Sequence, residues 1–268
     1  MGTFVEISLS GYSQSQRTFA IEQAFLEITR VEKAMSFHDG QSELSRLNRL
    51  PVNQWMGAGP GLLEVLNFAE KLYRLSGGQF NVAIGGLLRF WKWLPALSLN
   101  LSAIQKVCWD DLQCPGFEIQ ETQVRRILDI EIDLGGIAKG YAVDRAVQRV
   151  QEILPAAQGL VNAGGDMRSF GLMDYPVAIR CGLKNKSRFY KINLCNQALA
   201  TSTVSFRSGQ SAYINILKKA SVRRQSTVFV RSHFCMIADA LTKVAFLLDQ
   251  TQAADLAAHF GAEIGVAL

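Results

Sequence analysis

The chain contains the run Asp133-Leu134-Gly135-Gly136-Ile137-Ala138-Lys139-Gly140-Tyr141-Ala142-Val143-Asp144, in which an apolar segment gives way to small residues and then to a helical pattern. We predict a strand over residues 126–134 and a helix that begins at the Gly135-Gly136 pair. The first amides of a helix have no partners within it, and without bulky side chains nearby they can bind a phosphate. Lys139 adds a positive charge in the first turn.

Two interpretations of this run stay open. The glycines can serve only to let a strand and a helix pack closely through a tight turn. Asp133 favours a binding role, because a carboxylate at a strand end can accept hydrogen bonds from a heteroaromatic ring or a ribose. The spacing fits neither a Walker A loop nor a dinucleotide fingerprint, so we predict a nucleotide site of another class.

Working outward from this run, helical patterns dominate the first third of the chain and strand patterns dominate the remainder. Segregated elements predict an α+β fold rather than an alternating, doubly wound sheet. Ser76-Gly77-Gly78 is expected to end the second helix, because glycine adopts the left-handed turn that ends helices. The predicted helices cover residues 16–35, 61–75, 135–150, 238–248 and 251–260, and the predicted strands cover residues 4–9, 126–134, 159–162, 177–181, 189–194, 212–217, 226–230 and 263–268.

A second candidate site lies on the predicted helix over residues 238–248. Positions three apart share a helix face, so Asp239 and Thr242 are expected to present a carboxylate and a hydroxyl together. Such hard oxygen ligands suit Mg²⁺, which completes its shell with phosphate oxygens and water. The alternative is a helix N-terminus at which Asp239 caps backbone amides.

Two polar or glycine-rich segments have a binding and a structural interpretation each. Residues 160–166 contain a glycine turn after a short apolar strand, which either approaches the same ligand or forms a plain β-turn. Residues 36–48 form either a binding loop with an aromatic ring for stacking or a capped helix junction. His38 has no marked Ser or Cys nucleophile nearby, so a hydrolase triad is not supported.

The composition fits a globular protein with a sizeable core, since 49% of the 268 residues are hydrophobic and 19% are charged. The net charge of +5 is scattered without a long basic run, so we expect no nucleic-acid partner. Five cysteines without a C-x-x-C pair indicate neither a zinc site nor a disulfide framework. Asp239 and Lys243 interrupt the best apolar stretch, so we expect no membrane span.

With these segments in order, the chain resembles the ApbE family of FAD:protein FMN transferases over nearly its whole length. The resemblance implies an α+β, ApbE-like (T-fold-like) fold of mixed sheets with packed helices. We expect a single domain over residues 1–268, with two lobes that meet near residues 94–101. The most specific matching block is residues 133–144, and the more modest blocks are residues 1–3, 35–48, 78–93, 161–166, 200–202 and 238–242.

The resemblance also implies an activity. FMN would pass from FAD, through a phosphoester bond, to a Thr or Ser hydroxyl of an acceptor flavoprotein, with AMP leaving and Mg²⁺ on the diphosphate. Asp239 and Thr242 would be metal ligands, with the backbone carbonyl of Gly136 as a further one. No catalytic residue is assigned, and the residues expected at the flavin nucleotide are Met1, His38, Gln79, Phe80, Asn81, Asp133, Lys139 and Tyr213.

Three positions depart from the family pattern. Asn81 stands where the family's Phe-Asp-Pro-Thr run has a carboxylate. The family's His-Ile-Ile-Asp-Pro segment has no counterpart, and Tyr213 falls where the histidine is expected; a neutral tyrosine titrates near 10 and is a poor base at neutral pH. Lys243 replaces a small or hydroxyl residue, so its ammonium either takes the place of one cation at the diphosphate or points to solvent.

These departures leave two alternatives to the transferase. One is an FAD pyrophosphatase, in which water replaces the acceptor hydroxyl, and the other is a flavin-binding protein without turnover. As numbered, the chain begins on the family's Met1-Gly2-Thr3 motif, which relatives carry behind an export signal. We therefore expect a cytoplasmic protein, or a periplasmic or membrane-anchored one if a signal lies upstream.

Overall fold

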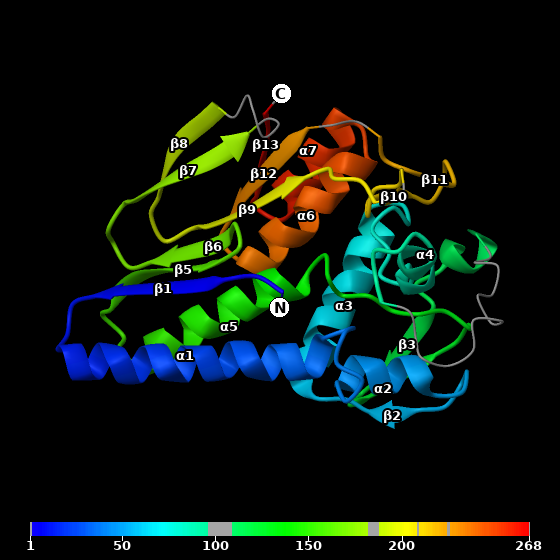
Figure 1. Cartoon of the computed structure of the whole chain (residues 1–268), viewed down its shortest axis with the longest axis horizontal. Helices are drawn as coiled ribbons and strands as arrows, with labels where there is room; N and C mark the ends of the chain where they lie inside the picture. The colour runs from blue at the N-terminus through cyan, green and yellow to red at the C-terminus, as the bar shows by residue number, and fades with distance from the viewer. Residues whose placement is uncertain (1, 96–108, 182–187, 208, 224–225, 268) are drawn as a thin grey trace. The chain divides into compact units, whose positions relative to one another are not determined.

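The computed structural model describes residues 2–95, 109–181, 188–207, 209–223 and 226–267, and the chain divides into two compact units. The first unit consists of residues 1–32, 137–203 and 225–268, and the second of residues 33–136 and 204–224. Both units combine helices with antiparallel strands, so the predicted α+β fold is confirmed (Figure 1). Residues 96–101, where two lobes were expected to meet, lie outside the described residues, and that expectation stays a prediction.

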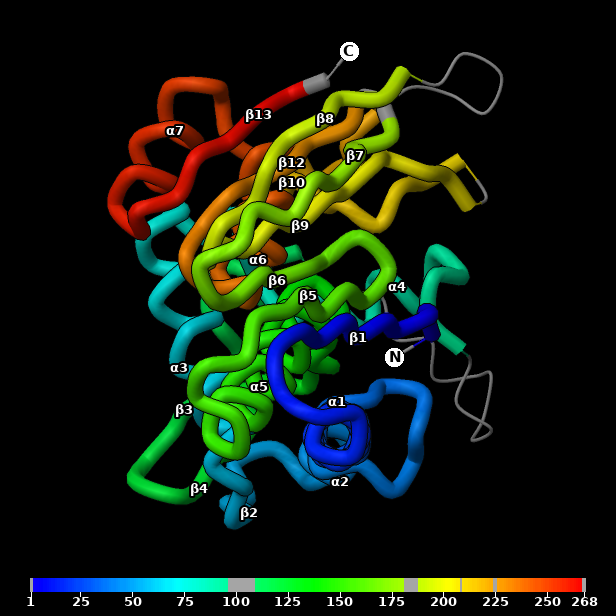
Figure 2. Tube along the Cα trace, turned by 90° about the vertical axis from the view of Figure 1, so that its left-hand side faces the viewer, coloured from blue at the N-terminus to red at the C-terminus, as the bar shows by residue number. Residues whose placement is uncertain are grey.

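The first unit is built on one antiparallel sheet. Figure 2 shows β1, β5 and β6 side by side, as their residue pairing requires. Alternate residues of β5 are buried, as expected for a strand with one face on the core. The strands follow the spatial order β1 (Val5–Ser10), β5 (Gln158–Ala163), β6 (Asp166–Phe170), β9 (Ala198–Thr203), β12 (Thr227–Ser232) and β13 (Glu263–Ala267).

Different elements cover the two faces of this sheet. Helices α5 (Ala138–Ile153) and α6 (Cys235–Leu247) pack on one face (Figure 1). The hairpin of β7 (Tyr175–Cys181) and β8 (Arg188–Leu194) buries Ile179 and Leu194 against Leu199 of β9 on the other. Helix α7 (Gln250–His259) packs on β13 and α6, and α1 (Gln14–Met35) begins in this unit.

Helices α5 and α6 approach each other closely at Gly140. A Cβ atom at this position would lie 2.3 Å from the carbonyl oxygen of Cys235 and 2.8 Å from the Cβ of Asp239. Real Cβ atoms do not approach other atoms so closely, so only glycine permits this packing. Gly140, within the run of residues 133–144, therefore fixes how α5 and α6 pack in the first unit.

The second unit contains shorter elements. Ser42 caps α2 by accepting a hydrogen bond from the Ser45 amide at 2.9 Å, and α3 ends as predicted at Ser76, with Gly77 and Gly78 at φ of 61° and 81°. The elements are α2 (Glu43–Arg49), β2 (Met56–Gly57), α3 (Pro60–Leu75), α4 (Gly85–Phe90), the 3-10 helix η2 (Trp109–Gln113), β3 (Phe117–Gln120), β4 (Gln123–Arg126), β10 (Ile214–Asn215) and β11 (Ala220–Ser221).

The predicted strand over residues 126–134 is wrong. Strand β4 ends at Arg126, and the irregular segment that follows bonds to side chains and loops instead of a neighbouring strand. The Asn48 side chain donates to the Ile132 carbonyl and accepts from the Ile132 amide, both at 2.8 Å. The buried Arg126 guanidinium donates to the Ile130 carbonyl at 2.6 Å and to those of Leu47 and Leu50. These side chains satisfy backbone groups that a sheet would otherwise pair.

Other boundaries also differ from the predictions, among them the end of helix α5, which lies at Ile153 instead of residue 150. Helix α5 begins at Ala138 instead of Gly135, and α6 begins at Cys235 instead of residue 238. Asp239 is therefore the fifth residue of α6 and not its N-terminus. Only Ile214–Asn215 of the predicted strand 212–217 is paired. The helices predicted over residues 16–35, 61–75 and 251–260 are confirmed within two residues.

No helix in the described ranges combines the length and apolar character needed to span a membrane.

Candidate functional site

Two buried carboxylates and two lysines meet in the first unit, and we call Lys139, Asp166, Asp239 and Lys243 the carboxylate–lysine cluster. Lys139 forms ion pairs with Asp166 and, at 3.7 Å between Nζ and Oδ2, with Asp239. Lys243 forms an ion pair with Oδ1 of Asp239, one helical turn away. Asp166 and Asp239 are 1% and 0% exposed, whereas the Lys139 and Lys243 side chains are 30% and 16% exposed. The lysine side chains are therefore more exposed than the carboxylates with which they pair.

The β5–β6 hairpin positions Asp166. Ala163 pairs with Asp166, so Gly164 and Gly165 form a two-residue turn, with φ of 66° and 101°. The turn is fixed by the Asn162 side chain, which accepts a hydrogen bond from the Gly165 amide at 3.0 Å. The second glycine segment of the sequence is thus a β-turn that places a carboxylate beside Lys139.

Helices α5 and α6 cap each other. Asp144, in α5, accepts hydrogen bonds from the Cys235 and Met236 amides at the start of α6, at 2.9 and 2.8 Å. Asp239, in α6, accepts one from the Gly140 amide in the first turn of α5, at 3.1 Å. Each carboxylate lies at the positive end of the partner helix, which stabilises its charge. The sequence left open that Asp239 caps backbone amides instead of binding a metal. Asp239 does cap an amide, but this amide belongs to α5 and not to its own helix.

Charge coupling sets the protonation of the cluster. Burial raises the pKa of Asp239, but the charges of Lys139 and Lys243 outweigh it, and the net pKa lies below its ordinary value. Burial and the Asp239 charge raise the pKa of Asp166 despite the two lysines. Burial lowers the pKa of Lys139, but Asp239 and Asp166 hold it above its ordinary value. Lys139 is therefore a cation at neutral pH.

The expected Mg²⁺ ligands already have partners in this cluster. Asp239 uses Oδ1 for Lys243 and Oδ2 for Gly140 and Lys139. The Thr242 hydroxyl donates to the Asp239 carbonyl at 2.7 Å and lies 2.7 Å from the Ser202 hydroxyl. Across the described residues, no three His, Cys, Asp or Glu side chains form a metal-binding group. In this arrangement the donor set does not fit a divalent cation on Asp239 and Thr242.

Gly136, the third expected metal ligand, belongs to the second unit. The metal roles of Gly136, Asp239 and Thr242 stay predictions.

In the second unit, Asp133 lies near the end of the irregular segment whose backbone is bonded by the side chains of Asn48 and Arg126. Its amide donates to the Val82 carbonyl at 2.8 Å, and its Oδ2 accepts from the Gly135 amide at 3.2 Å. Burial raises the pKa of Asp133 to about 6, although the Gly135 amide and the charge of His38 lower it. Asp133 therefore changes charge close to the pH range of most assays.

Three consecutive residues of the second unit, Gln79, Phe80 and Asn81, were expected at the flavin nucleotide, and their environments differ. Asn81 is a structural amide: it donates to the Leu112 and Cys114 carbonyls at 3.0 and 3.1 Å, and it accepts from the Ala83 amide at 2.7 Å. Phe80 is buried. Gln79 is 4% exposed, and its buried Oε1 has no hydrogen-bond partner among the described residues, so the capacity of this atom to accept a hydrogen bond is unused.

The remaining predicted residues are placed as follows. Tyr213 is half-buried before β10, and its carbonyl accepts a hydrogen bond from the Val222 amide at 2.8 Å. His38 is exposed in the junction that Ser36 and Ser42 cap, which confirms the capped junction between α1 and α2. Met1 lies outside the described residues, and its role stays a prediction.

Comparison with known proteins decides the family. A sequence profile of the ApbE family matches residues 1–267. The chain belongs to the ApbE family. An ApbE protein from Thermotoga maritima has the same fold, with a TM-score of 0.82 and 25% identity over 99% of this chain and 91% of that one. The flavin transferase ApbE from Vibrio cholerae has a TM-score of 0.80 and 22% identity over 99% and 90%.

Curated ApbE relatives are similar over shorter stretches. The FAD:protein FMN transferase of Chlamydia pneumoniae is 27% identical over 168 residues, which cover 61% of this chain and 52% of that protein. The corresponding protein of Vibrio cholerae is 26% identical over 80% of this chain and 69% of its own length. The chain thus spans about half the length of the first of these relatives.

The ApbE resemblance assigned Lys139 and Asp239 to the site. It gave Asp166 no role, and it left Lys243 either as a substitute for one cation at the diphosphate or as a side chain that points to solvent. A signal for Asp166 was present: an aspartate that opens a strand in an apolar neighbourhood needs a buried partner. Lys243 follows Asp239 by four residues, the spacing of helical ion pairs. Neither signal specifies which partner is chosen, because Asp166 meets Lys139 only through the packing of β6 on α5.

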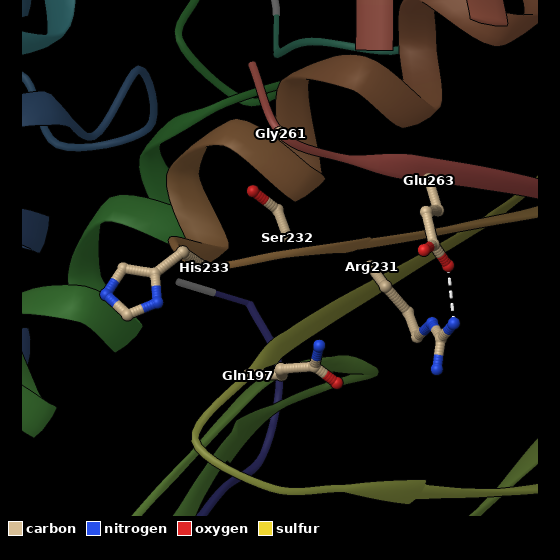
Figure 3. Close-up of a pocket in the computed structure, with 6 residues that line it drawn as sticks. All are labelled: Gln197, Arg231, Ser232, His233, Gly261 and Glu263. Carbon is tan, nitrogen blue, oxygen red and sulfur yellow. Dashed lines mark hydrogen bonds and ion pairs between the residues drawn. The ribbon is translucent and has the colours of Figure 1, made fainter. Parts of the chain in front are cut away.

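A separate shallow pocket of about 150 Å³ lies in the first unit at the ends of β9 and β12 (Figure 3). The Ser232 side chain is 4% exposed, and its hydroxyl has no partner among the described residues. Arg231 forms an ion pair with Glu263 across its rim, as the dashed line shows (Figure 3). None of the residues that line it was expected at the flavin nucleotide; they are Gln197, Arg231, Ser232, His233, Gly261 and Glu263.

Proposed function

We propose that this ApbE chain transfers FMN from FAD to a Thr or Ser hydroxyl of an acceptor flavoprotein and releases AMP. The observation that carries this proposal is the carboxylate–lysine cluster. Three of its residues come from family blocks, namely Lys139 from residues 133–144, Asp166 from residues 161–166 and Asp239 from residues 238–242. Its lysine side chains are more exposed than its buried carboxylates, and lysine cations bind and orient phosphate oxygens.

The reaction requires one exchange at phosphorus. The acceptor hydroxyl oxygen forms a bond to the phosphorus of the FMN half, and the bond from that phosphorus to the bridging oxygen breaks. AMP leaves with the bridging oxygen, and the hydroxyl proton passes to a base. The cluster contributes charge neutralisation and orientation, which account for most of the catalysis in phosphoryl transfer.

Asp133 and Gln79 supply polar acceptors in the second unit. The Asp133 carboxylate and the unpartnered Gln79 Oε1 both suit the N–H edge of a flavin or adenine ring. Asn81 has a structural role in this proposal, because its amide already holds two carbonyls and one backbone amide. The Mg²⁺ dependence expected from the resemblance stays a prediction, because the arrangement of Asp239 and Thr242 does not support it.

Intact-mass spectrometry tests the proposed function. The chain is incubated with FAD and a purified acceptor flavoprotein domain, in parallel with Mg²⁺ and with EDTA. We expect the acceptor to gain one FMN through a phosphoester in at least one of the two conditions, and a domain with the acceptor Thr or Ser changed to Ala to gain none. Release of FMN and AMP without acceptor labelling would identify a pyrophosphatase instead, and bound but unconsumed FAD would identify a binding protein.

A further inference from the structure

Lys243 occupies the coordination position on Asp239 that a divalent cation would need. Its ammonium bonds Oδ1 of Asp239, while Lys139 and the Gly140 amide occupy Oδ2. A metal ion at this carboxylate would have to displace Lys243 and would then lie beside two ammonium groups. The mutual repulsion of such close cations is unfavourable.

The position of the two lysines in the cluster suits a second function. An ammonium has three N–H donors, so a lysine that gives one to a carboxylate can still give others to a phosphate. The carboxylates below are almost fully buried, and the Lys139 and Lys243 side chains are more exposed. Of the four side chains in the cluster, the two lysines are therefore the ones that an approaching anion can reach.

The carboxylates also fix the lysines in place. Asp239 accepts hydrogen bonds or ion pairs from three partners, and Asp166 orients Lys139. Oδ1 of Asp166 is buried and has no hydrogen-bond partner in the part of the chain that the structure describes. This oxygen is an acceptor and would repel a phosphate, so the phosphate contacts of the cluster must come from Lys139 and Lys243.

We propose that Lys243, together with Lys139, neutralises the diphosphate of FAD as a pair of fixed cations, so that this chain binds the diphosphate without a divalent metal. The identity of the ligand rests on the proposed function. In this arrangement Lys243 is a binding residue, and Asp166 and Asp239 are positioning residues that hold the ammonium groups.

Calorimetric titration of the unaltered chain with ADP, FAD and adenosine tests this directly. ADP and FAD are each titrated in EDTA and in Mg²⁺, and adenosine serves as the control without a diphosphate. We expect the dissociation constants of ADP and FAD in the two buffers to agree within about threefold, and adenosine to bind at least about tenfold more weakly. A loss of more than about tenfold in EDTA would overturn the proposal.

A matched pair of variants locates the effect. Lys243→Met removes the ammonium and keeps the length of the side chain, and Lys191→Met removes an exposed lysine of β8 in the same unit. In EDTA, we expect Lys243→Met to weaken ADP binding by about tenfold or more, as for the loss of a charged hydrogen bond, and Lys191→Met to leave it unchanged. Equal affinities of Lys243→Met and the unaltered chain would exclude a binding role for Lys243.

A metal titration gives a readout that does not depend on nucleotide. Free Mn²⁺ is followed by electron paramagnetic resonance as protein is added. We expect little Mn²⁺ to bind the unaltered chain and at least about tenfold tighter binding to Lys243→Thr, which replaces the ammonium with an oxygen ligand next to Asp239. Tight Mn²⁺ binding by the unaltered chain would contradict the proposal. Transfer in Mg²⁺ but not in EDTA would also overturn it and leave the proposed function standing.

Discussion

The two units of the chain hold their candidate site residues in different ways. In the first, the carboxylate–lysine cluster lies on regular elements, and its charged side chains bond mainly to one another and to the first turn of α5. In the second, Asp133 lies on an irregular segment whose backbone is bonded by the side chains of Asn48 and Arg126. The first unit thus depends on close helix packing and the second on long-range bonds from side chain to backbone.

The strongest test of the helix packing is Gly140→Ala. The added Cβ would meet the Cys235 carbonyl at 2.3 Å, so α5 and α6 must separate and the mutual capping must loosen. We expect the free energy of unfolding in urea to fall by about 3 kcal/mol. Gly57→Ala is the control, because no atom lies within 4 Å of its added Cβ, and it should change stability by less than about 1 kcal/mol. Equal losses in both variants would show that the contact does not limit the packing.

The corresponding test of the second unit is Arg126→Met. The variant removes a buried guanidinium that donates to three carbonyls, so we expect a loss of about 2 to 3 kcal/mol in the same urea experiment. Arg125→Met is the matched neighbour, since Arg125 makes an ion pair with Glu118 near the surface, and it should cost less than about 1 kcal/mol. If Arg125→Met proved the more damaging variant, the assigned role of Arg126 would be wrong.

A smaller effect is expected from the titration of Asp133. Burial holds its pKa at about 6, above the ordinary 3.8, so the folded state binds this proton more tightly than the unfolded state. The stabilisation is therefore full below pH 4 and is lost as the pH rises to 6, by up to about 2 kcal/mol. Urea unfolding at pH 4, 5, 6 and 7 should show this fall in the unaltered chain and a flatter profile in Asp133→Asn. Parallel profiles would contradict a raised pKa at Asp133.

The smallest expected effect concerns Thr242. Thr242→Val removes the hydroxyl shared between the Asp239 carbonyl and Ser202 in a buried position, so we expect a loss of about 1 kcal/mol in thermal and urea unfolding. Thr29→Val in α1 removes a similar bond, to the Phe25 carbonyl, at an exposed position and should change stability by less than about 0.5 kcal/mol. No difference between the two variants would mean that the Thr242 hydroxyl has no structural role.

The sequence alone predicted the regular elements well because their periodicity is local. The apolar spacing over residues 16–35 and the glycine stop after residue 75 gave α1 and α3. The predicted strand over residues 126–134 failed because its backbone partners are side chains far along the chain, such as Asn48, 84 residues before Ile132. Local propensity describes such a segment as extended but does not reveal whether its partner is a strand or a side chain.

The sequence was enough to determine the family and the α+β fold. It also indicated which charged residues, in the run 133–144 and in α6, belong to the candidate site. Only the tertiary structure decided what those charges do. Asp239 caps the partner helix and pairs with Lys139 and Lys243, and Thr242 bonds to Ser202. The physical reason is that a buried carboxylate must find a partner, and the packing of α5, α6 and β6 determines which cations and amides lie within reach.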